Sequence, residues 1–355
     1  MPRGTLTVLG LIATGAVPAL GFCLWLLLSV GRHVPAAGGG HVPSIFSPAS
    51  GHAKSLYDLS MFALAVIGAI FALVSCLLVN ALVRYRTTAA NAHAEPPQVY
   101  GSSQIELAWT IVPVLIVLVM FLSAARVIHA IQDAPRRAGA LDVTVVGHQF
   151  WWEFRYPALG IVTANELHIP VSDPERPRPT YLKLLSADTD HSFWVPELGG
   201  KTDLIPNRVN EMWIDPDRPG LFLGQCAQYC GTQHGKMLLR VYVDSHEAFD
   251  AWVRAQRQPP IRDERTAAGR QVFETTACLN CHAIGSTAAT GRYGPDLTHL
   301  MSRSTIAAGA TVNTRQSLRR WIEAPDSIKP GSLMPAMKLA DGDLEALVSY
   351  MQTLR

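Results

Sequence analysis

The stretch GQCAQYCGTQHGKM, residues 224–237, places two cysteines, a histidine and a methionine at the spacing C-x3-C-x3-H-x2-M. A further histidine, His191, lies 35 residues before the first cysteine, in the segment DTDHSFWVPELGGK. Structural zinc takes four Cys or His ligands and has no use for methionine, whereas soft sulfur together with imidazole favours copper. Because each of two thiolates can bridge two metal ions, the motif predicts a compact binuclear copper centre suited to electron transfer.

Three other interpretations of this motif remain open. Cys226 and Cys230 could form a disulfide in an oxidising compartment. The cluster could instead hold zinc, or His234 and Met237 could be packed core residues. The six cysteines of the chain are too few for a disulfide scaffold, so their spacing carries more information than their number.

Short β-rich runs surround the motif between residues 141 and 253, where no long helical pattern occurs. The runs are VTVVG, FWWEFRY, TYLKLLS, RVNEMWI, GLFLG and MLLRVYV, and clusters of Pro, Gly and Asp separate them. Strands at this spacing predict an antiparallel β-sandwich. We therefore expect an all-β domain over residues 131–253.

The part of the chain before this domain contains long uncharged stretches. Only 16% of the 355 residues are charged, against about 25% in soluble domains. The uncharged stretches cover residues 4–31, 61–83 and 107–125, and each approaches or exceeds the roughly 20 apolar residues that span a bilayer. We expect transmembrane helices over residues 57–83 and 105–130.

The first of these stretches has a second interpretation. It follows Met1 and Arg3 and ends before the small-residue run VPAAGGG, an arrangement that is typical of a signal peptide. Residues 1–38 are therefore either a removed signal peptide, which we favour, or a first membrane segment. Core helices of a soluble protein are the remaining alternative for all three stretches.

Basic residues predict the orientation in the membrane. Arg84 and Arg86 directly follow the second stretch, and by the positive-inside rule they place the connection 84–104 in the cytoplasm. The third stretch then leads outward, so the chain from residue 131 onward lies outside the cytoplasm. Glu106, at the cytoplasmic start of this third stretch, is either a solvated anchor or part of a proton path.

A second motif follows a polar, Pro-containing segment, residues 254–264, that is typical of a linker. In GRQVFETTACLNCHAI, Cys278, Cys281 and His282 form C-x-x-C-H, the attachment motif of c-type haem. The main alternative is a thioredoxin-like redox pair, which needs a βαβ setting that the sequence lacks. A sixth iron ligand is expected downstream, and methionine is common there because it raises the reduction potential.

The membrane segments and the β-rich domain together resemble a known protein family. Residues 43–253 resemble subunit II of cytochrome c oxidase with its copper A domain, in SPAS, IELAWTIVP, GHQFWWEFRY, DHSFWVPELGGKTD and CAQYCGTQHGKM. By that likeness the dinuclear copper is bound by His191, Cys226, Cys230, His234 and Met237, together with the backbone carbonyl of Gln228. Glu106 matches the acid at the mouth of a proton path that leads into subunit I.

Two positions depart from the family pattern. The family has Glu at the position of Gln228, and the Glu side chain also binds a magnesium ion shared with subunit I. A neutral amide is a poorer ligand for a hard cation, so magnesium is a doubtful cofactor here. The family also has, after Gly-His-Gln, a Trp that receives electrons from soluble cytochrome c, whereas this chain has Phe150, followed by Trp151 and Trp152.

Residues 265–355 resemble a class I cytochrome c, which is an all-α domain. Gly269 and Phe273 match its N-terminal helix, and Pro295 in GPDL matches the loop that orients the haem-binding histidine. The segment DGDLEALVSYMQTL has the helical periodicity of its last helix. Met334, in IKPGSLMPAM, occupies the position of the axial methionine, and the other candidates are Met301 and Met337.

The resemblance implies subunit II of a caa-type haem–copper oxidase, with two membrane helices, a copper cupredoxin and a fused cytochrome c. Electrons would enter at haem c, pass to copper A and continue to subunit I, where oxygen reduction is coupled to proton pumping. The protein would be multi-pass in a bacterial inner membrane, with its C-terminal domains on the periplasmic side. Alternatives are a membrane-tethered electron carrier for another reductase and a copper delivery or assembly protein.

The expected partners are oxidase subunit I, other oxidase subunits, membrane lipid and a soluble or membrane electron donor. Nucleic acid is excluded, because 30 basic and 28 acidic residues give a net charge of only +2. Residues 131–253 hold 16 acidic and 11 basic residues, whereas residues 265–355 hold 7 acidic and 10 basic residues. From these opposite charges we predict that the haem domain docks on the copper domain electrostatically, with ordinary surface charge as the alternative.

Overall fold

The computed structural model describes residues 42–355 except 91, 94, 96, 97, 99, 133–139, 173–178 and 262. The prediction of a signal peptide or first membrane segment at 1–38 lies outside the described residues. The described part forms two units: residues 55–132 make a helical unit, and residues 42–54 together with 140–355 make an outer unit.

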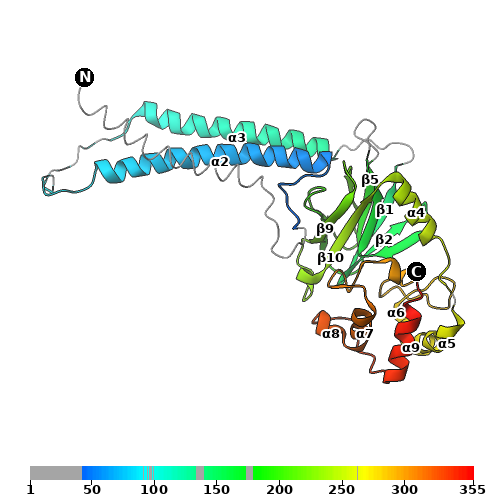
Figure 1. Ribbon diagram of the computed structural model, residues 1–355. Coiled ribbons are helices and arrows are strands. Elements are labelled where there is room, and N and C mark those ends of the chain that lie inside the picture. The colour runs from blue at the N-terminus through cyan, green and yellow to red at the C-terminus, as the bar shows by residue number, and fades with distance from the viewer. Residues whose placement is uncertain are drawn as a thin grey trace. The chain divides into compact units, whose positions relative to one another are not determined.

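Two long apolar helices, α2 (Gly51–Arg84) and α3 (Ser103–Gln132), account for the helical unit and are drawn in blue and cyan in Figure 1. Both are long and apolar enough to cross a membrane. α2 begins before the predicted span 57–83, and its first turn, with buried His52 and Ala53, belongs to the outer unit.

Most of the outer unit is a sandwich of two five-stranded sheets (Figure 1). The first sheet has the order β3-β2-β1-β5-β8 and the second the order β4-β10-β9-β6-β7. The strands are β1 (Asp142–His148), β2 (Trp151–Tyr156), β3 (Ile161–Ala164), β4 (Glu166–Pro170), β5 (Thr180–Ser186), β6 (His191–Trp194), β7 (Thr202–Leu204), β8 (Asn210–Ile214), β9 (Gly220–Cys226) and β10 (Leu238–Asp244).

The predicted β-sandwich is confirmed, but the expectation of purely antiparallel pairing is wrong. β1 pairs in parallel with β5, and β10 pairs in parallel with β4. After β3 the chain crosses to the second sheet for β4 and returns beside β1 as β5. Parallel neighbours need such crossover connections, and the residue pattern of one run does not record which strand it will join.

The core between the sheets fixes the strands that lead to the candidate metal ligands. Trp152, Phe154 and Tyr156 of β2 are at most 1% exposed. Burying each such side chain contributes about 1.5–3 kcal/mol relative to leaving it in water. The ring of Trp152 also lies edge-on to Phe193 of β6, with 5.8 Å between ring centroids. This contact holds the strand that begins with His191.

Helix α4 (His246–Gln256) ends the sandwich domain. It begins after Ser245, whose hydroxyl accepts a hydrogen bond from the backbone N–H of Ala248, and it buries Phe249 and Val253. The first three residues of the predicted linker 254–264 therefore belong to a helix, and the connection to the next element starts at residue 257.

The C-terminal domain is helical, as predicted, with one small addition. Its helices are the 3-10 turns η2 (Glu264–Thr266) and η3 (Leu300–Ser302) and the α-helices α5 (Ala267–Thr275), α6 (Cys278–Cys281), α7 (Arg315–Glu323), α8 (Pro325–Ile328) and α9 (Asp341–Met351). The addition is a two-stranded hairpin of β11 (Thr305–Ile306) and β12 (Thr311–Val312), which the all-α expectation did not include.

Helices α5 and α9 cross at Gly269. A Cβ atom at this glycine would lie 2.0 Å from the carbonyl oxygen of Ala346, so only glycine lets the two backbones approach this closely. Phe273 and Tyr350 meet at the same crossing, with 6.2 Å between ring centroids. The crossing forms the frame on which α6 and its C-x-x-C-H motif are placed.

Candidate functional site

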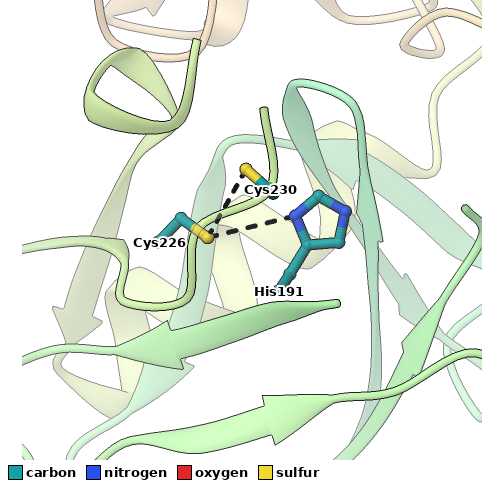
Figure 2. Close-up of side chains that lie close together, drawn as sticks. All are labelled: His191, Cys226 and Cys230. Carbon is teal, nitrogen blue, oxygen red and sulfur yellow. Dashed lines mark hydrogen bonds between the residues drawn. The ribbon is translucent and has the colours of Figure 1, made fainter. Parts of the chain in front are cut away.

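The structure brings the predicted metal ligands together from three segments. His191 begins β6, Cys226 ends β9, and the other ligands follow in the loop that leads to β10. Figure 2 shows His191, Cys226 and Cys230 converging, and their ligand atoms all lie within 4.8 Å of one another.

The distances within this cluster are short enough for shared metal ions. Cys226 Sγ lies 3.9 Å from His191 Nδ1 and 3.9 Å from Cys230 Sγ. Cys230 Sγ lies 3.7 Å from His234 Nδ1 and 3.9 Å from Met237 Sδ. The carbonyl oxygen of Gln228 is 3.1 Å from Cys226 Sγ. All six predicted groups are therefore gathered around one pair of sulfur atoms.

The two cysteines are free thiols in the structure. Their separation of 3.9 Å is far longer than the roughly 2.05 Å of a disulfide bond. Both are buried, and His191 and Met237 are completely buried beside them. His234 is half-buried. A set of two thiols, two imidazoles and a thioether fits soft copper ions better than zinc, which uses no thioether.

Hydrogen bonds from the backbone and from one side chain hold the ligand loop in place. The N–H of Cys226 donates to the carbonyl of Met237 at 3.0 Å, which closes the loop at its two ends. The side chain of Gln149 donates to the carbonyl of Cys230 at 2.6 Å. Gly147 leaves room for the imidazole, because a Cβ atom there would lie 2.9 Å from His191 Cδ2.

Asp188 orients the first histidine ligand. Its Oδ1 lies 2.8 Å from His191 Nε2, which leaves Nδ1 directed toward Cys226. Burial lowers the pKa of His191, but the hydrogen bonds with Asp188 and Cys226 outweigh it and raise the pKa above its usual value. Burial likewise raises the pKa of Asp188, and its hydrogen bonds with His191 and the N–H of Gln149 lower it overall.

The two thiols behave as a coupled pair. The hydrogen bond between the sulfur atoms lowers the pKa of Cys226 and raises the pKa of Cys230 well above its usual value. The first proton of the pair is therefore lost more easily than the second. Metal ions favour the loss of both protons, since the thiolate and not the thiol is the ligand.

A cavity in the outer unit is lined by the residues of the second motif. Cys278, Cys281, His282, Met334 and Met337 all contribute to its wall. Met301, the third candidate for the sixth ligand, is not among the lining residues and packs in the helical core instead. The structure thus leaves two of the three methionines in a position to face a bound group.

His282 is prepared to act as a neutral ligand. Its Nδ1 lies 2.7 Å from the carbonyl oxygen of Pro295, which accepts a hydrogen bond and leaves Nε2 free for iron. Burial lowers the pKa of His282, so the imidazole stays uncharged. A Cβ atom at Gly294 would lie 2.5 Å from His282 Cε1, so only glycine at this position leaves room for the imidazole ring.

The same cavity is also lined by residues that carried no signal in the sequence. Arg303 is buried at its wall, and its Nε has no hydrogen-bond partner among the described residues. Gln149, Phe150, Trp151, Asn165 and Gln233 of the sandwich domain form another part of the wall. Asp188 could have been found from its place three residues before His191, but no local pattern distinguishes Arg303 or Gln233.

Glu106 lies in the first turn of α3 with an exposed side chain. Its backbone carbonyl accepts a hydrogen bond from the hydroxyl of Thr110. This residue belongs to the helical unit, whereas all the other candidates belong to the outer unit.

Three family profiles match successive parts of the chain. Cytochrome c oxidase subunit II, transmembrane domain, matches residues 44–126, and the periplasmic domain of the same subunit matches residues 141–243. The profile of cytochrome c matches residues 266–355.

Several curated proteins are similar over most of the chain. Cytochrome c oxidase subunit 2 of Alkalihalophilus pseudofirmus is 33% identical over 315 residues, which cover 87% of this chain and 90% of that protein. The protein of the same name from Bacillus sp. PS3 is 29% identical over 94% of this chain and 99% of its own length. Quinol oxidase subunit 2 of Bacillus cereus is 30% identical over 62% of this chain and 76% of that protein.

Proposed function

The chain belongs to the cytochrome c oxidase subunit II family, with a fused C-terminal cytochrome c domain, and from this premise we propose which of its residues hold the two redox centres. As a member it is a component of the terminal oxidase, with a copper A domain and an electron-accepting haem c domain. When bound, haem c accepts single electrons and copper A passes them toward the oxygen-reducing subunit.

The dinuclear copper is held by the cluster around the two thiols. Its ligands are His191, Cys226, Cys230, His234 and Met237, with the backbone carbonyl of Gln228. The observation that carries this assignment is the set of 3.7–3.9 Å separations that link both sulfurs to each other, to the two imidazoles and to the thioether. The side chain of Gln228 is exposed and neutral, so it offers no carboxylate for magnesium.

Haem c is held in the cavity of the C-terminal domain. The thiols of Cys278 and Cys281 would form thioether bonds with the vinyl groups of haem, and His282 would bind the iron. Met334 would supply the second iron ligand, because it lines the cavity and matches the methionine ligand of the cytochrome c family. Met337 also lines the cavity and is the alternative that an experiment has to exclude.

The remaining assignments concern the membrane and the complex. The chain is a membrane protein whose C-terminal domains are periplasmic. More specifically, we propose that α2 and α3 cross a bacterial inner membrane, contact its lipid and bind oxidase subunit I. Glu106 then lies at the entrance of a proton path into that subunit, and an external donor delivers electrons to haem c.

The test is metal analysis of the full chain, purified from membranes of a host that attaches c-type haem. Two copper ions and one iron per chain are expected, together with the near-infrared absorption of a mixed-valence copper pair. The Cys226→Ser variant should keep its haem and lose this absorption. Haem with a single zinc ion would exclude the copper assignment. Copper that a mild chelator removes rapidly would point to a copper delivery protein instead.

A further inference from the structure

The cytochrome domain covers the aromatic run of the copper domain. Phe150 and Trp151 are only 7% and 8% exposed, and they line the cavity that also holds Cys278 and His282. Trp151 packs with Ala308 of the cytochrome domain in one buried cluster. This face of the copper domain is therefore occupied by the protein's own second domain.

Glu166 of β4 is the first polar contact that holds the domains together. The residue is 2% exposed, and its carboxylate accepts hydrogen bonds from the N–H of Ser304 at 3.0 Å and from the N–H and hydroxyl of Thr305 at 2.9 Å each. All three donors belong to the cytochrome domain. Because a buried carboxylate is costly unless it is hydrogen-bonded, the domains gain stability only when they meet in this register.

Lys329 makes the second polar contact between the domains. It lies near Met334 in the cytochrome domain and contacts Phe150 and Gln233 of the copper domain. Its ammonium group is buried and donates to the carbonyl of Phe150 at 2.6 Å. In return, the side chain of Gln233 donates to the carbonyls of Lys329 and Pro330 at 2.9 Å each. Lys329 lies five residues before Met334, so the loop of the haem ligand is tied to the loop of the copper ligands.

The two contacts differ in their effect on stability. Burial lowers the pKa of Lys329 to about 7, which means that placing its charge here carries an energetic cost. Glu166, with three donors on its carboxylate, provides binding energy, whereas Lys329 fixes the relative position of the two loops. Neighbouring contacts from Arg240 to Thr305 and from Tyr242 to Ser304 extend the Glu166 side of the interface.

From these contacts, and on the basis of the proposed function, we propose that the cytochrome domain is a fixed electron donor, locked onto the aromatic face of the copper domain by Glu166 and Lys329. In this fixed position the cytochrome domain covers Phe150 and Trp151 of the copper domain. The domains meet through the hydrogen bonds of Glu166 and Lys329 and through the packing of Trp151 against Ala308. A fixed interface of this kind is insensitive to salt, unlike a docking process steered by net charge.

The first test measures the stability of the contact between the domains and does not depend on bound copper. Hydrogen–deuterium exchange of the full haem-loaded chain in detergent reports on the amides of Ser304 and Thr305. Their exchange should be about tenfold faster or more in Glu166→Ala and in the milder Glu166→Gln, because each amide loses a charge-assisted hydrogen bond. The matched controls are Glu211→Gln and Lys183→Met, an exposed cross-strand pair on β8 and β5 that should leave this exchange unchanged.

The second test follows electron transfer from haem to copper after a light pulse. In the native chain the rate should not change between low and high ionic strength, whereas in Glu166→Ala/Lys329→Met it should be slower and salt-dependent. A native rate that changes with salt, or exchange at Ser304 and Thr305 that is the same in both Glu166 variants as in the native chain, would overturn the lock. A native chain with both centres loaded but no transfer between them would instead contradict the proposed function. The visible spectrum of the haem shows that each variant is folded.

Discussion

At the scale of single residues, Asp188 determines how His191 presents itself to the metal. It binds the ring nitrogen that faces away from the thiols and also accepts the N–H of Gln149 at 2.7 Å. Replacing it with Asn removes the negative charge that raises the basicity of the ligand. We expect Asp188→Asn to lower the copper affinity by about 10–100-fold, measured by competition with a chelator of known affinity. The exposed neighbour Asp190, changed to Asn, is the control, and equal affinities of the two variants would contradict the role of Asp188.

The two methionines that line the cavity can be separated by spectroscopy. A thioether ligand raises the reduction potential of haem and gives a sulfur-to-iron charge-transfer band in the oxidised state. Met334→Leu should abolish this band and lower the potential, whereas Met337→Leu should keep both. The opposite pattern would assign the ligand to Met337, which would contradict the family register in this loop.

Glu153 of β2 gives the copper domain a pH-dependent contribution to stability. Burial alone would raise its pKa, but hydrogen bonds with His148 and Arg155 outweigh burial and lower the pKa to about 2. The lowered pKa means that this stabilisation is present above the unfolded value of 4.5 and is lost as the pH falls toward 2.

We therefore expect Glu153→Gln to lower the free energy of unfolding by about 1–2 kcal/mol at neutral pH, a value reduced for solvent screening because Arg155 is 38% exposed. The difference from the native chain should shrink steadily below pH 4.5, as followed by thermal unfolding at a series of pH values. Glu211→Gln, at an exposed position of β8, should show no such trend. A difference that is independent of pH would show that packing, not charge, is responsible.

At the scale of elements, the crossing of α5 and α9 depends on one missing side chain. Gly269→Ala would place a methyl group 2.0 Å from the carbonyl oxygen of Ala346, so the helices must separate. Overpacking of this kind typically costs about 1–3 kcal/mol, and we expect lower thermal stability and less attached haem. Gly342→Ala, in α9 with no atom within 4 Å of the added carbon, should be neutral or slightly stabilising. Equal losses in both variants would show that helix content, not the crossing, is limiting.

The sequence predicts the longer strands better than the short ones. VTVVG, TYLKLLS and MLLRVYV correspond to β1, β5 and β10, because seven residues are enough to show a strand pattern. β3, β4, β6 and β7 have only three to five residues, and none of them is among the predicted runs. This matters for function, since β4 begins with Glu166 and β6 begins with His191. Their positions depend on pairing with strands that are distant in the sequence, which no local pattern reports.

The candidate site was easier to predict than the contacts around it. The copper cluster could be identified from spacing and a family resemblance because five of its six groups lie within 12 residues, 226–237. The interface could not be identified in this way, because Glu166 and Thr305 are 139 residues apart and neither belongs to a motif. Burial and partner geometry, which appear only in the fold, distinguish these residues from other surface groups.

At the scale of the whole molecule, net charge correctly predicted that the copper and cytochrome domains are in contact. The contacts themselves are not pairs of opposite charges. The acidic and basic balance of residues 131–253 and 265–355 predicted that the two domains meet electrostatically. They do meet, but Glu166 binds backbone amides and the hydroxyl of Thr305, and Lys329 binds a carbonyl, so both charged groups make their hydrogen bonds across the interface with neutral partners. Domain-wide charge therefore says little about the atoms that hold such a contact.

The short connection between α4 and η2, residues 257–263, also determines the supply of electrons at the level of the cell. Because donor and acceptor are parts of one polypeptide, their stoichiometry is fixed at synthesis, and no change in gene expression or compartment volume can dilute one relative to the other. A separate, freely diffusing electron carrier would bind the copper domain less often whenever its own concentration fell. Here each copper domain has its own haem domain, so the encounter of these two domains does not depend on protein concentration.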